Sequence, residues 1–238
     1  DSSHSPEFAM IESYQAYGDW RSIADLTRSL VQNAAMAVAG SHTVTHHDGR
    51  QADLGGKWRE ISLYDAISQG VGETVTALTP IDDLKKIATK LGIKIDPKWI
   101  TGKLAEEIFE HVAKDQLIEP TFVMGFPVDT SPLVRAHREI PGVAEKWDLY
   151  VDGFELATGY SELIDPVIQR ERLIEQATLG AKGDLEAMQV DEDFLRAMEF
   201  AMPPMGGMGM GVDRLLMALT GLGIRETILF PLVKPEIE

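Results

Sequence analysis

Three acidic residues, each seven positions from the next, are the first candidates for chemistry: Asp148, Glu155 and Glu162. This spacing does not place all three on one face of a strand, because side chains alternate between its two faces. Asp152 and Gly153 form a typical hairpin turn, which would bring Asp148 and Glu155 together from paired strands. Two converging carboxylates predict a Mg²⁺ site, and solvated strand ends are the alternative. Glu162 could instead pair with a cationic group of a substrate.

A glycine-rich run at residues 206–211, which leads into an apolar helix, is the second candidate. Glycines allow close approach of a ligand or another backbone, and the first N–H groups of the next helix could bind phosphate. The run matches neither the P-loop nor the dinucleotide-binding pattern, so strand–helix packing is an equal alternative. Arg214 favours a ligand site, because a guanidinium there could clamp a phosphate or stack on a base.

Several classes of chemistry lack their residues in this chain. It contains no cysteine, and therefore no disulfide, thiolate metal site or cysteine nucleophile. No serine lies in a Gly-x-Ser-x-Gly pattern, so a hydrolytic triad is not indicated. His42, His46 and His47 lack a third well-placed acidic or sulfur ligand, so we interpret the adjacent pair as exposed hairpin residues.

The composition is that of a globular chain with an acidic surface. Of 238 residues, 44% are hydrophobic and 25% are charged, which permits a sizeable core. The net charge of −16 disfavours sequence-independent binding of nucleic acid by this chain alone and suits a cationic ligand. No run of about 18 apolar residues or signal-peptide pattern is present, so we expect a cytoplasmic portion without membrane contact.

The elements that position these residues follow from the spacing of apolar side chains. Residues 8–17 predict a strand in which Phe8, Met10, Glu12 and Tyr14 share one face, and this mixed face is typical of a pocket wall. Further strands are predicted at 43–47, 51–54 and 120–124, and as a hairpin within 147–162. Helical patterns occur at 23–38, 79–92, 103–114, 166–180, 191–202 and 215–222.

Taken in order, several segments resemble the class II lysyl-tRNA synthetases. Residues 4–14 resemble the second half of that family's motif 2, residues 207–214 match its motif 3, and residues 154–163 resemble its lysine-pocket segment. The resemblance covers essentially the whole chain and implies an α+β fold with an antiparallel sheet flanked by helices. It also implies catalytic-domain segments at 1–62 and 120–238, with a helical insertion at 63–119.

The resemblance implies that lysine and ATP form lysyl-adenylate, whose lysine then passes to tRNA(Lys), with Mg²⁺ as cofactor. It assigns the catalytic role to Arg214 and metal binding to Asp148 and Glu155. The residues implied for ATP binding are His4, Phe8, Met10, Gly209 and Arg214. Those implied for lysine binding are Glu12, Tyr14, Thr158, Tyr160 and Glu162.

The sequence departs from the family pattern in two ways. Ser5 and Thr158 stand where the family commonly has Asn, although both keep hydrogen-bonding capacity. The chain also begins inside motif 2, so it resembles the C-terminal part of a catalytic domain. The motif 2 arginine, the dimer-forming motif 1 and the anticodon-binding domain would lie upstream. We therefore expect a sheet that is incomplete at its N-terminal end, a chain that is inactive alone, and a homodimer formed through motif 1.

Two other interpretations stay open. A truncated paralogue could bind a lysine-like ligand or a protein partner without catalysis, but the retained metal pair and Arg214 favour an enzyme. Some members of the family are fused to a membrane enzyme that transfers lysine to phosphatidylglycerol. Such a fusion would place this portion at the cytoplasmic face of a membrane, and only upstream residues could decide it.

Overall fold

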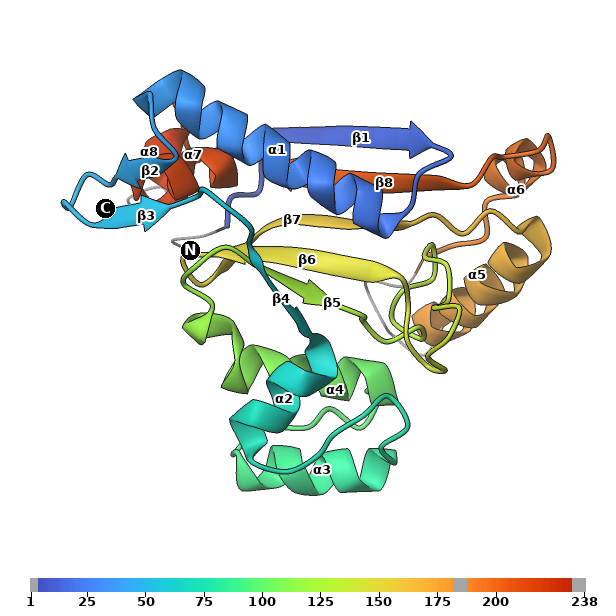
Figure 1. Ribbon diagram of the computed structural model, residues 1–238. Coiled ribbons are helices and arrows are strands. Elements are labelled where there is room, and N and C mark those ends of the chain that lie inside the picture. Colours follow the sequence, from blue (N-terminus) through green and yellow to red (C-terminus); the bar gives the residue numbers. More distant parts are fainter. Residues whose placement is uncertain (1–3, 182–187, 233–238) are drawn as a thin grey trace, which may run out of the picture.

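The computed structural model describes residues 4–181 and 188–232, and its centre is a six-stranded sheet (Figure 1). The strands lie in the order β1-β8-β7-β6-β5-β4, and all neighbours are antiparallel except β4 and β5. Their bounds are Met10–Ala16 (β1), Arg59–Ser62 (β4), Thr121–Met124 (β5), Lys146–Val151 (β6), Phe154–Ser161 (β7) and Met205–Gly211 (β8). The predicted α+β class with a largely antiparallel sheet is confirmed.

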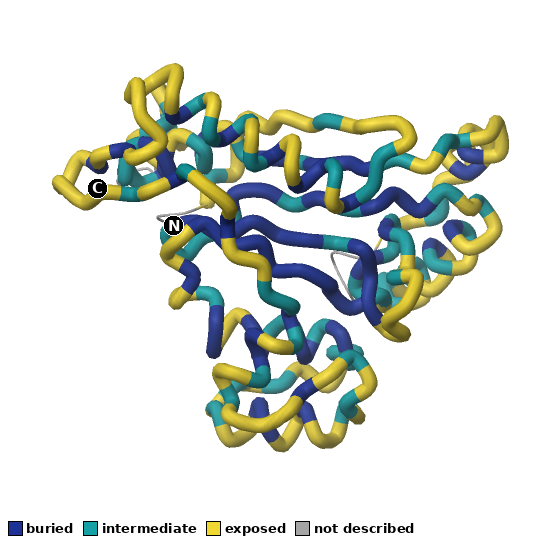
Figure 2. Tube along the Cα trace, in the orientation of Figure 1, coloured by how far each residue is buried: buried dark blue, intermediate teal, exposed yellow. Residues whose placement is uncertain are grey.

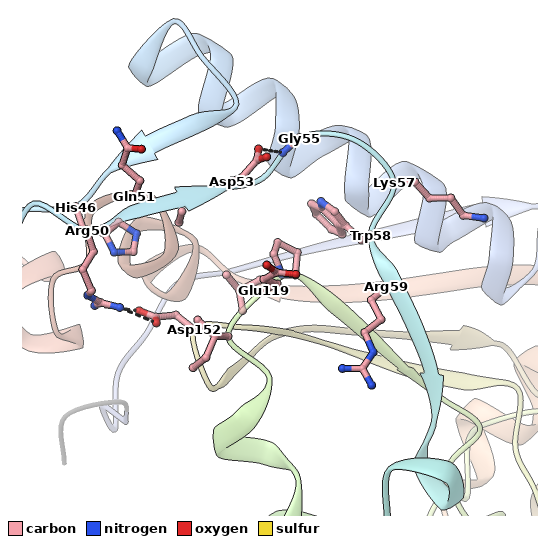
Figure 3. A pocket seen from close by; sticks show the side chains of 14 residues that line it. His46, Arg50, Gln51, Asp53, Gly55, Lys57, Trp58, Arg59, Glu119 and Asp152 are labelled. Atoms are coloured by element: carbon pink, nitrogen blue, oxygen red, sulfur yellow. Dashed lines mark hydrogen bonds and ion pairs between the residues drawn. The ribbon is translucent and has the colours of Figure 1, made fainter. Parts of the chain in front are cut away.

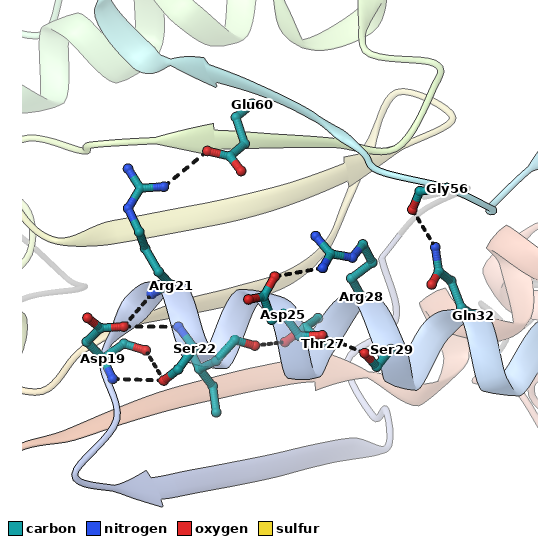
Figure 4. A network of polar contacts seen from close by, with 11 residues as sticks. Asp19, Arg21, Ser22, Asp25, Thr27, Arg28, Ser29, Gln32, Gly56 and Glu60 are labelled. Atoms are coloured by element: carbon teal, nitrogen blue, oxygen red, sulfur yellow. Dashed lines mark hydrogen bonds and ion pairs between the residues drawn. The ribbon is translucent and has the colours of Figure 1, made fainter.

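Helix α1 (Trp20–Ala39) covers one face of this sheet. A capping box fixes its first turn: the Asp19 carboxylate accepts from the Ser22 N–H, and the Ser22 hydroxyl accepts from the Asp19 N–H (Figure 4). Because the cap sets the start, the helix begins before the predicted residue 23. Ile23 and Val31 are fully buried in the main core. On the sheet side that core includes Phe122, Trp147, Leu149, Met208 and Met210.

Helices on the other face cover only its β4–β5–β6 end (Figure 1). They are α2 (Leu63–Val71), α3 (Ile81–Lys90), α4 (Thr101–Val112) and the short 3₁₀ helix η1 (Lys114–Gln116). Their core includes Val123 of β5 and Tyr150 of β6, and among the described residues it contains none from β1, β7 or β8. The end of this face formed by β7, β8 and β1 is therefore not covered by these helices and can hold a site. All four helices fall within 63–119, and the domain boundaries themselves stay a prediction.

The remaining elements lie around the sheet. They are β2 (Thr43–Thr45), β3 (Gln51–Asp53), α5 (Pro166–Ala181), α6 (Glu192–Met198), α7 (Val212–Thr220) and α8 (Ile224–Thr227). The predicted helix at 191–202 is too long, because Ala201 adopts a left-handed φ of 64°. The predicted start at 215 is also wrong, because the chain passes directly from β8 into α7 through the N-cap Gly211.

Burial differs sharply between the strands (Figure 2). Five of the six residues of β6 are buried, whereas β1 is exposed along almost its whole length at one edge of the sheet. This edge carries exposed apolar surface, since Met10 and Tyr14 of β1 are 51% and 59% exposed. Within the described residues, no helix has both the length and the apolar character needed to cross a bilayer.

Candidate active site

The glycine-rich run forms strand β8, in which glycine and methionine alternate. Met208 and Met210 are buried in the core beside α1. Gly207, Gly209 and Gly211 face the other side of the sheet, because successive residues of a strand point to opposite faces. On β1, the partners of Gly207, Gly209 and Gly211 are Tyr14, Glu12 and Met10. The run is therefore a strand and not a phosphate-binding loop, and Gly207, Gly209 and Gly211 place no side chain on the face of the sheet between β1 and β7.

A cavity of about 270 Å³ lies where β8 meets α7. It is lined by all five residues that the resemblance assigns to ATP: His4, Phe8, Met10, Gly209 and Arg214. Glu155 and Thr158 of β7 also line it. Arg214 Nη1 donates a hydrogen bond of 2.7 Å to the backbone carbonyl of Glu155, which fixes the guanidinium at the cavity wall. An aromatic ring and a guanidinium around one cavity can contact the base and phosphates of a nucleotide.

Asp213, to which the sequence assigned no role, anchors one wall of this cavity. Its carboxylate accepts a hydrogen bond of 2.8 Å from the backbone N–H of Ala9, and the N–H of Val212 donates to the carbonyl of Ala9 at 2.9 Å. These two bonds tie the chain between Phe8 and Met10 to the start of α7. No local signal could reveal this contact, because the partners lie at opposite ends of the chain.

Three of the five predicted lysine-binding residues, Tyr14, Tyr160 and Glu162, lie around Gly207, and Glu12 stands opposite Gly209 on the same strand β8. A Cβ atom on Gly207 would overlap Glu162 Oε1 and would lie 3.0 Å from the ring of Tyr14. The Tyr14 hydroxyl donates to Glu12 Oε2 at 3.1 Å. Tyr160 stands directly opposite Gly207 on β7. The fifth residue lies apart from this group, in the lining of the 270 Å³ cavity.

Glu162 carries a buried carboxylate oxygen that has no hydrogen-bond partner among the described residues. The residue is 9% exposed, and Oε1 is the unpartnered atom. Burial, and then the nearby charge of Glu12, raise the pKa of Glu162 to about 7. Burial also raises the pKa of Tyr160, and the Glu162 carboxylate adds to that shift. An ammonium group placed here would bind the free oxygen and relieve the repulsion between the carboxylates.

Asp148 and Glu155 lie on the β6–β7 hairpin, as the turn at residues 152–153 predicts. They are not direct partners: Asp148 stands opposite Thr158, Glu155 stands opposite Tyr150, and a bulge lies between the two pairs. Asp148 is 4% exposed, and its Oδ1 has no hydrogen-bond partner. Burial, and then the charge of Asp148, raise the pKa of Glu155 above its usual value. An unpartnered carboxylate oxygen beside a second carboxylate fits a divalent cation.

The described residues contain no group of three or more His, Asp or Glu side chains arranged around a metal. This holds for the three hairpin histidines as well. One expectation about them is wrong, because His46 is buried, with Nε2 3.0 Å from the carbonyl oxygen of Ala218. His42 and His47 are exposed.

A second cavity, of about 440 Å³, lies between the β2–β3 hairpin and β4 (Figure 3). None of the predicted site residues lines it. Its charged side chains are Arg50, Lys57, Arg59, Asp53, Glu119 and Asp152. Arg50 is already paired with Asp48 at 2.7 Å and with Asp152 at 3.0 Å. With equal numbers of cationic and acidic groups, this cavity favours no particular class of ligand.

Comparison with known proteins identifies the family of this chain. The family model described as tRNA synthetases class II (D, K and N) matches residues 1–234. The chain therefore belongs to the class II tRNA synthetases.

Its relatives narrow the class further. Over 99% of its length the chain is 65% identical to a lysine–tRNA ligase of Kineococcus radiotolerans, of which it covers 47%. It is 53% identical to lysine–tRNA ligase 1 of Mycobacterium tuberculosis H37Rv, of which it covers 48%. It is also 51% identical to the lysylphosphatidylglycerol biosynthesis bifunctional protein LysX of Mycolicibacterium gilvum, of which it covers 22%. The chain thus spans about half the length of the lysine–tRNA ligases that it matches.

Proposed function

We propose that this chain forms part of the catalytic domain of a lysine–tRNA ligase. One observation carries the choice of lysine: a buried oxygen of Glu162, without a partner among the described residues, lies near Glu12 and two tyrosines, beside strands β1, β7 and β8, which also line the nucleotide-sized cavity. Carboxylates that are buried without a partner reject neutral side chains and favour a cation. The lysine–tRNA ligases among its relatives support the same substrate.

The proposed reaction has two steps. An oxygen of the lysine carboxylate attacks the α-phosphorus of ATP and pyrophosphate leaves, which forms lysyl-adenylate. A ribose hydroxyl of the terminal adenosine of tRNA(Lys) then attacks the carbonyl carbon, and AMP leaves. Displacement at phosphorus depends mainly on positioning and on neutralising charge, so a protein nucleophile is not required.

Beside Gly207, Glu162 and Tyr14 would contact the ε-ammonium group of lysine. Glu12, which already accepts a hydrogen bond from Tyr14, would complete the negative surroundings, and Tyr160 would close the opposite wall. Thr158 would hydrogen-bond near the substrate carboxylate, because it lines the nucleotide cavity and lies two residues before Tyr160 on β7.

In the cavity of about 270 Å³, Phe8 would stack on adenine and the backbone of Met10 would bind the edge of the base. His4 and Arg214 would contact the phosphates, and Arg214 would stabilise the charge that develops during transfer. Gly209 would leave room for the nucleotide, since its nearest neighbour is the terminal methyl group of Met10.

Asp148 and Glu155 would hold Mg²⁺, since their paired carboxylates and the free Oδ1 suit that ion. A bound Mg²⁺ neutralises phosphate charge. We also propose tRNA(Lys) as partner and the cytoplasm as the location, because aminoacylation of tRNA is the activity named for the relatives. The exposed edge at β1 supports association with further protein, which in this family would include a second subunit.

The test is lysine-dependent exchange of pyrophosphate into ATP by the complete protein, with arginine and norleucine as matched amino acids. Norleucine has the apolar chain of lysine without the ammonium group, so it isolates the contribution of Glu162. We expect exchange with lysine only. Exchange with norleucine would contradict the ammonium site. Binding of lysine without any exchange would identify a non-catalytic paralogue instead.

A further inference from the structure

Lys146 is a half-buried cation beside the proposed metal carboxylates, and the reaction described above does not use it. It lies two residues before Asp148 on β6, and therefore on the same face of the sheet. Its Nζ is 3.3 Å from Asp148 Oδ2, and its side chain is 22% exposed. The same Nζ lies 4.1 Å from the centre of the Phe126 ring, so the ammonium group is held between a carboxylate and an aromatic face.

Three carboxylates surround this one ammonium group. Asp148 contacts it directly, and the charges of Glu106 and Glu155 also act on it. Glu106 belongs to α4, and Thr130 donates to its Oε1 at 2.6 Å. Burial alone would lower the pKa of Lys146, but these carboxylates outweigh burial and raise it. The cluster therefore has a net charge of −2 when every carboxylate is ionised.

We infer that Lys146 is a positioning residue for the divalent-cation site: it holds Asp148 through Oδ2 and thereby turns Oδ1 toward the cation. The two oxygens of Asp148 support this division of roles, because Oδ2 is paired with Lys146 whereas the buried Oδ1 has no hydrogen-bond partner among the residues that the structure describes. The inference rests on the proposed function in taking Asp148 and Glu155 as the ligands. Residues that orient a metal ligand typically change metal affinity about 10- to 100-fold when they are lost.

Lys146 also connects the helices to the site. The charge of Glu106 on α4 raises the pKa of Lys146 on β6, so a helix residue acts electrostatically on the residue that pairs with Asp148. The orientation of Asp148 thus depends on a side chain that is itself held from two sides. A lysine that only competed with the metal would have the opposite effect, because its removal would tighten metal binding.

The test measures Mn²⁺ binding to the complete protein by electron paramagnetic resonance, with Mn²⁺ alone as the probe. We expect Lys146→Met to weaken Mn²⁺ binding at least about 10-fold, and Lys146→Arg to bind within about 3-fold of wild type. Lys86→Met is the matched control, because Lys86 is exposed on α3 and pairs with Asp83 at 2.7 Å. In pyrophosphate exchange, Lys146→Met should need more Mg²⁺ for half-maximal rate while the KM for lysine stays unchanged.

Unchanged or tighter Mn²⁺ binding by a folded Lys146→Met variant would overturn the inference, as would a wild-type protein that binds no Mn²⁺. If Lys146→Met does not fold, Lys146→Gln replaces it, because glutamine keeps a hydrogen-bond donor and a similar length without the charge. The wild type could bind Mn²⁺ more tightly than Lys146→Met does and still show no lysine-dependent exchange. That result would contradict the proposed function and leave the inference standing.

Discussion

Replacing Gly207 by alanine tests the proposed ammonium site without removing any of its charged groups. The new Cβ would lie less than 3.0 Å from Glu162 Oε1, a separation that real Cβ atoms essentially never show, and 3.0 Å from two ring atoms of Tyr14. Both neighbours must move, because β8 is a central strand held by β1 on one side and β7 on the other. The change therefore displaces the groups that would bind the ε-ammonium group of lysine.

The expected magnitude follows from that displacement. Restoring normal contact requires Oε1 of Glu162 to shift by roughly 1 Å, which is enough to break a charge-assisted hydrogen bond. Such a bond contributes about 1.5–3 kcal/mol. At about 1.4 kcal/mol for each factor of ten, the KM for lysine should rise about 10- to 150-fold. The KM for ATP should change much less, because Gly207 does not line the nucleotide cavity.

The assay is lysine-dependent pyrophosphate exchange, with the two substrates varied separately. Gly209→Ala is the comparison on the same strand, because its Cβ would meet only the flexible end of Met10, at 3.2 Å. We expect that variant to affect the KM for ATP and to leave the KM for lysine within about 3-fold of wild type. A folded Gly207→Ala protein with wild-type KM for lysine would refute the placement of the ammonium group at Glu162.

Four further predictions concern three side chains. The pKa of Glu162, about 7 without substrate, means that lysine affinity should rise with pH between about 6 and 8, and calorimetric titrations of Glu162→Gln should lose this dependence. Because folding raises the pKa of Glu162, the wild-type protein loses stability as pH rises from the pKa of the unfolded chain to about 7. Thermal melts should therefore show that Glu162→Gln is more stable than wild type at pH 8 and not at pH 5. Phe8→Leu should raise the KM for ATP about 5- to 30-fold through lost stacking, and an equal rise in the KM for lysine would contradict the assignment. Asp213→Ala should lower the free energy of unfolding by about 1–3 kcal/mol in urea titrations and weaken ATP binding, because the N–H of Ala9 loses its acceptor; unchanged ATP binding would argue against that anchor.

Most elements were predictable from local patterns. The Asp152–Gly153 turn and the helical spacing within 63–119 act over a few residues, and the corresponding hairpin and helices are present. Strand β8 was not predicted, because glycine is depleted in strands. Errors occurred where a cap or a backbone torsion set the boundary. The cap at Asp19 extends α1, and the left-handed residue Ala201 shortens the helical pattern near 191–202.

Within the candidate site, the sequence supplied the residue types and the tertiary structure supplied their neighbours. The resemblance pointed to Glu162 and Asp148, but it could not show that each keeps one buried oxygen without a partner. It also missed Lys146 as the partner of Asp148, although their spacing of two residues on a strand was a usable signal.

The sequence by itself determined the class of protein, the alternating faces of the strands and the acidic residues available for a cation, because these depend on residue type and short-range spacing. Only the tertiary structure decided which distant groups meet. It joined Asp213 to Ala9, and it placed Glu106 of a helix near enough to Lys146 of a strand for its charge to raise the pKa of the lysine. Such contacts depend on how the chain returns across the sheet, and the burial that leaves a carboxylate oxygen unpartnered arises only when the elements pack.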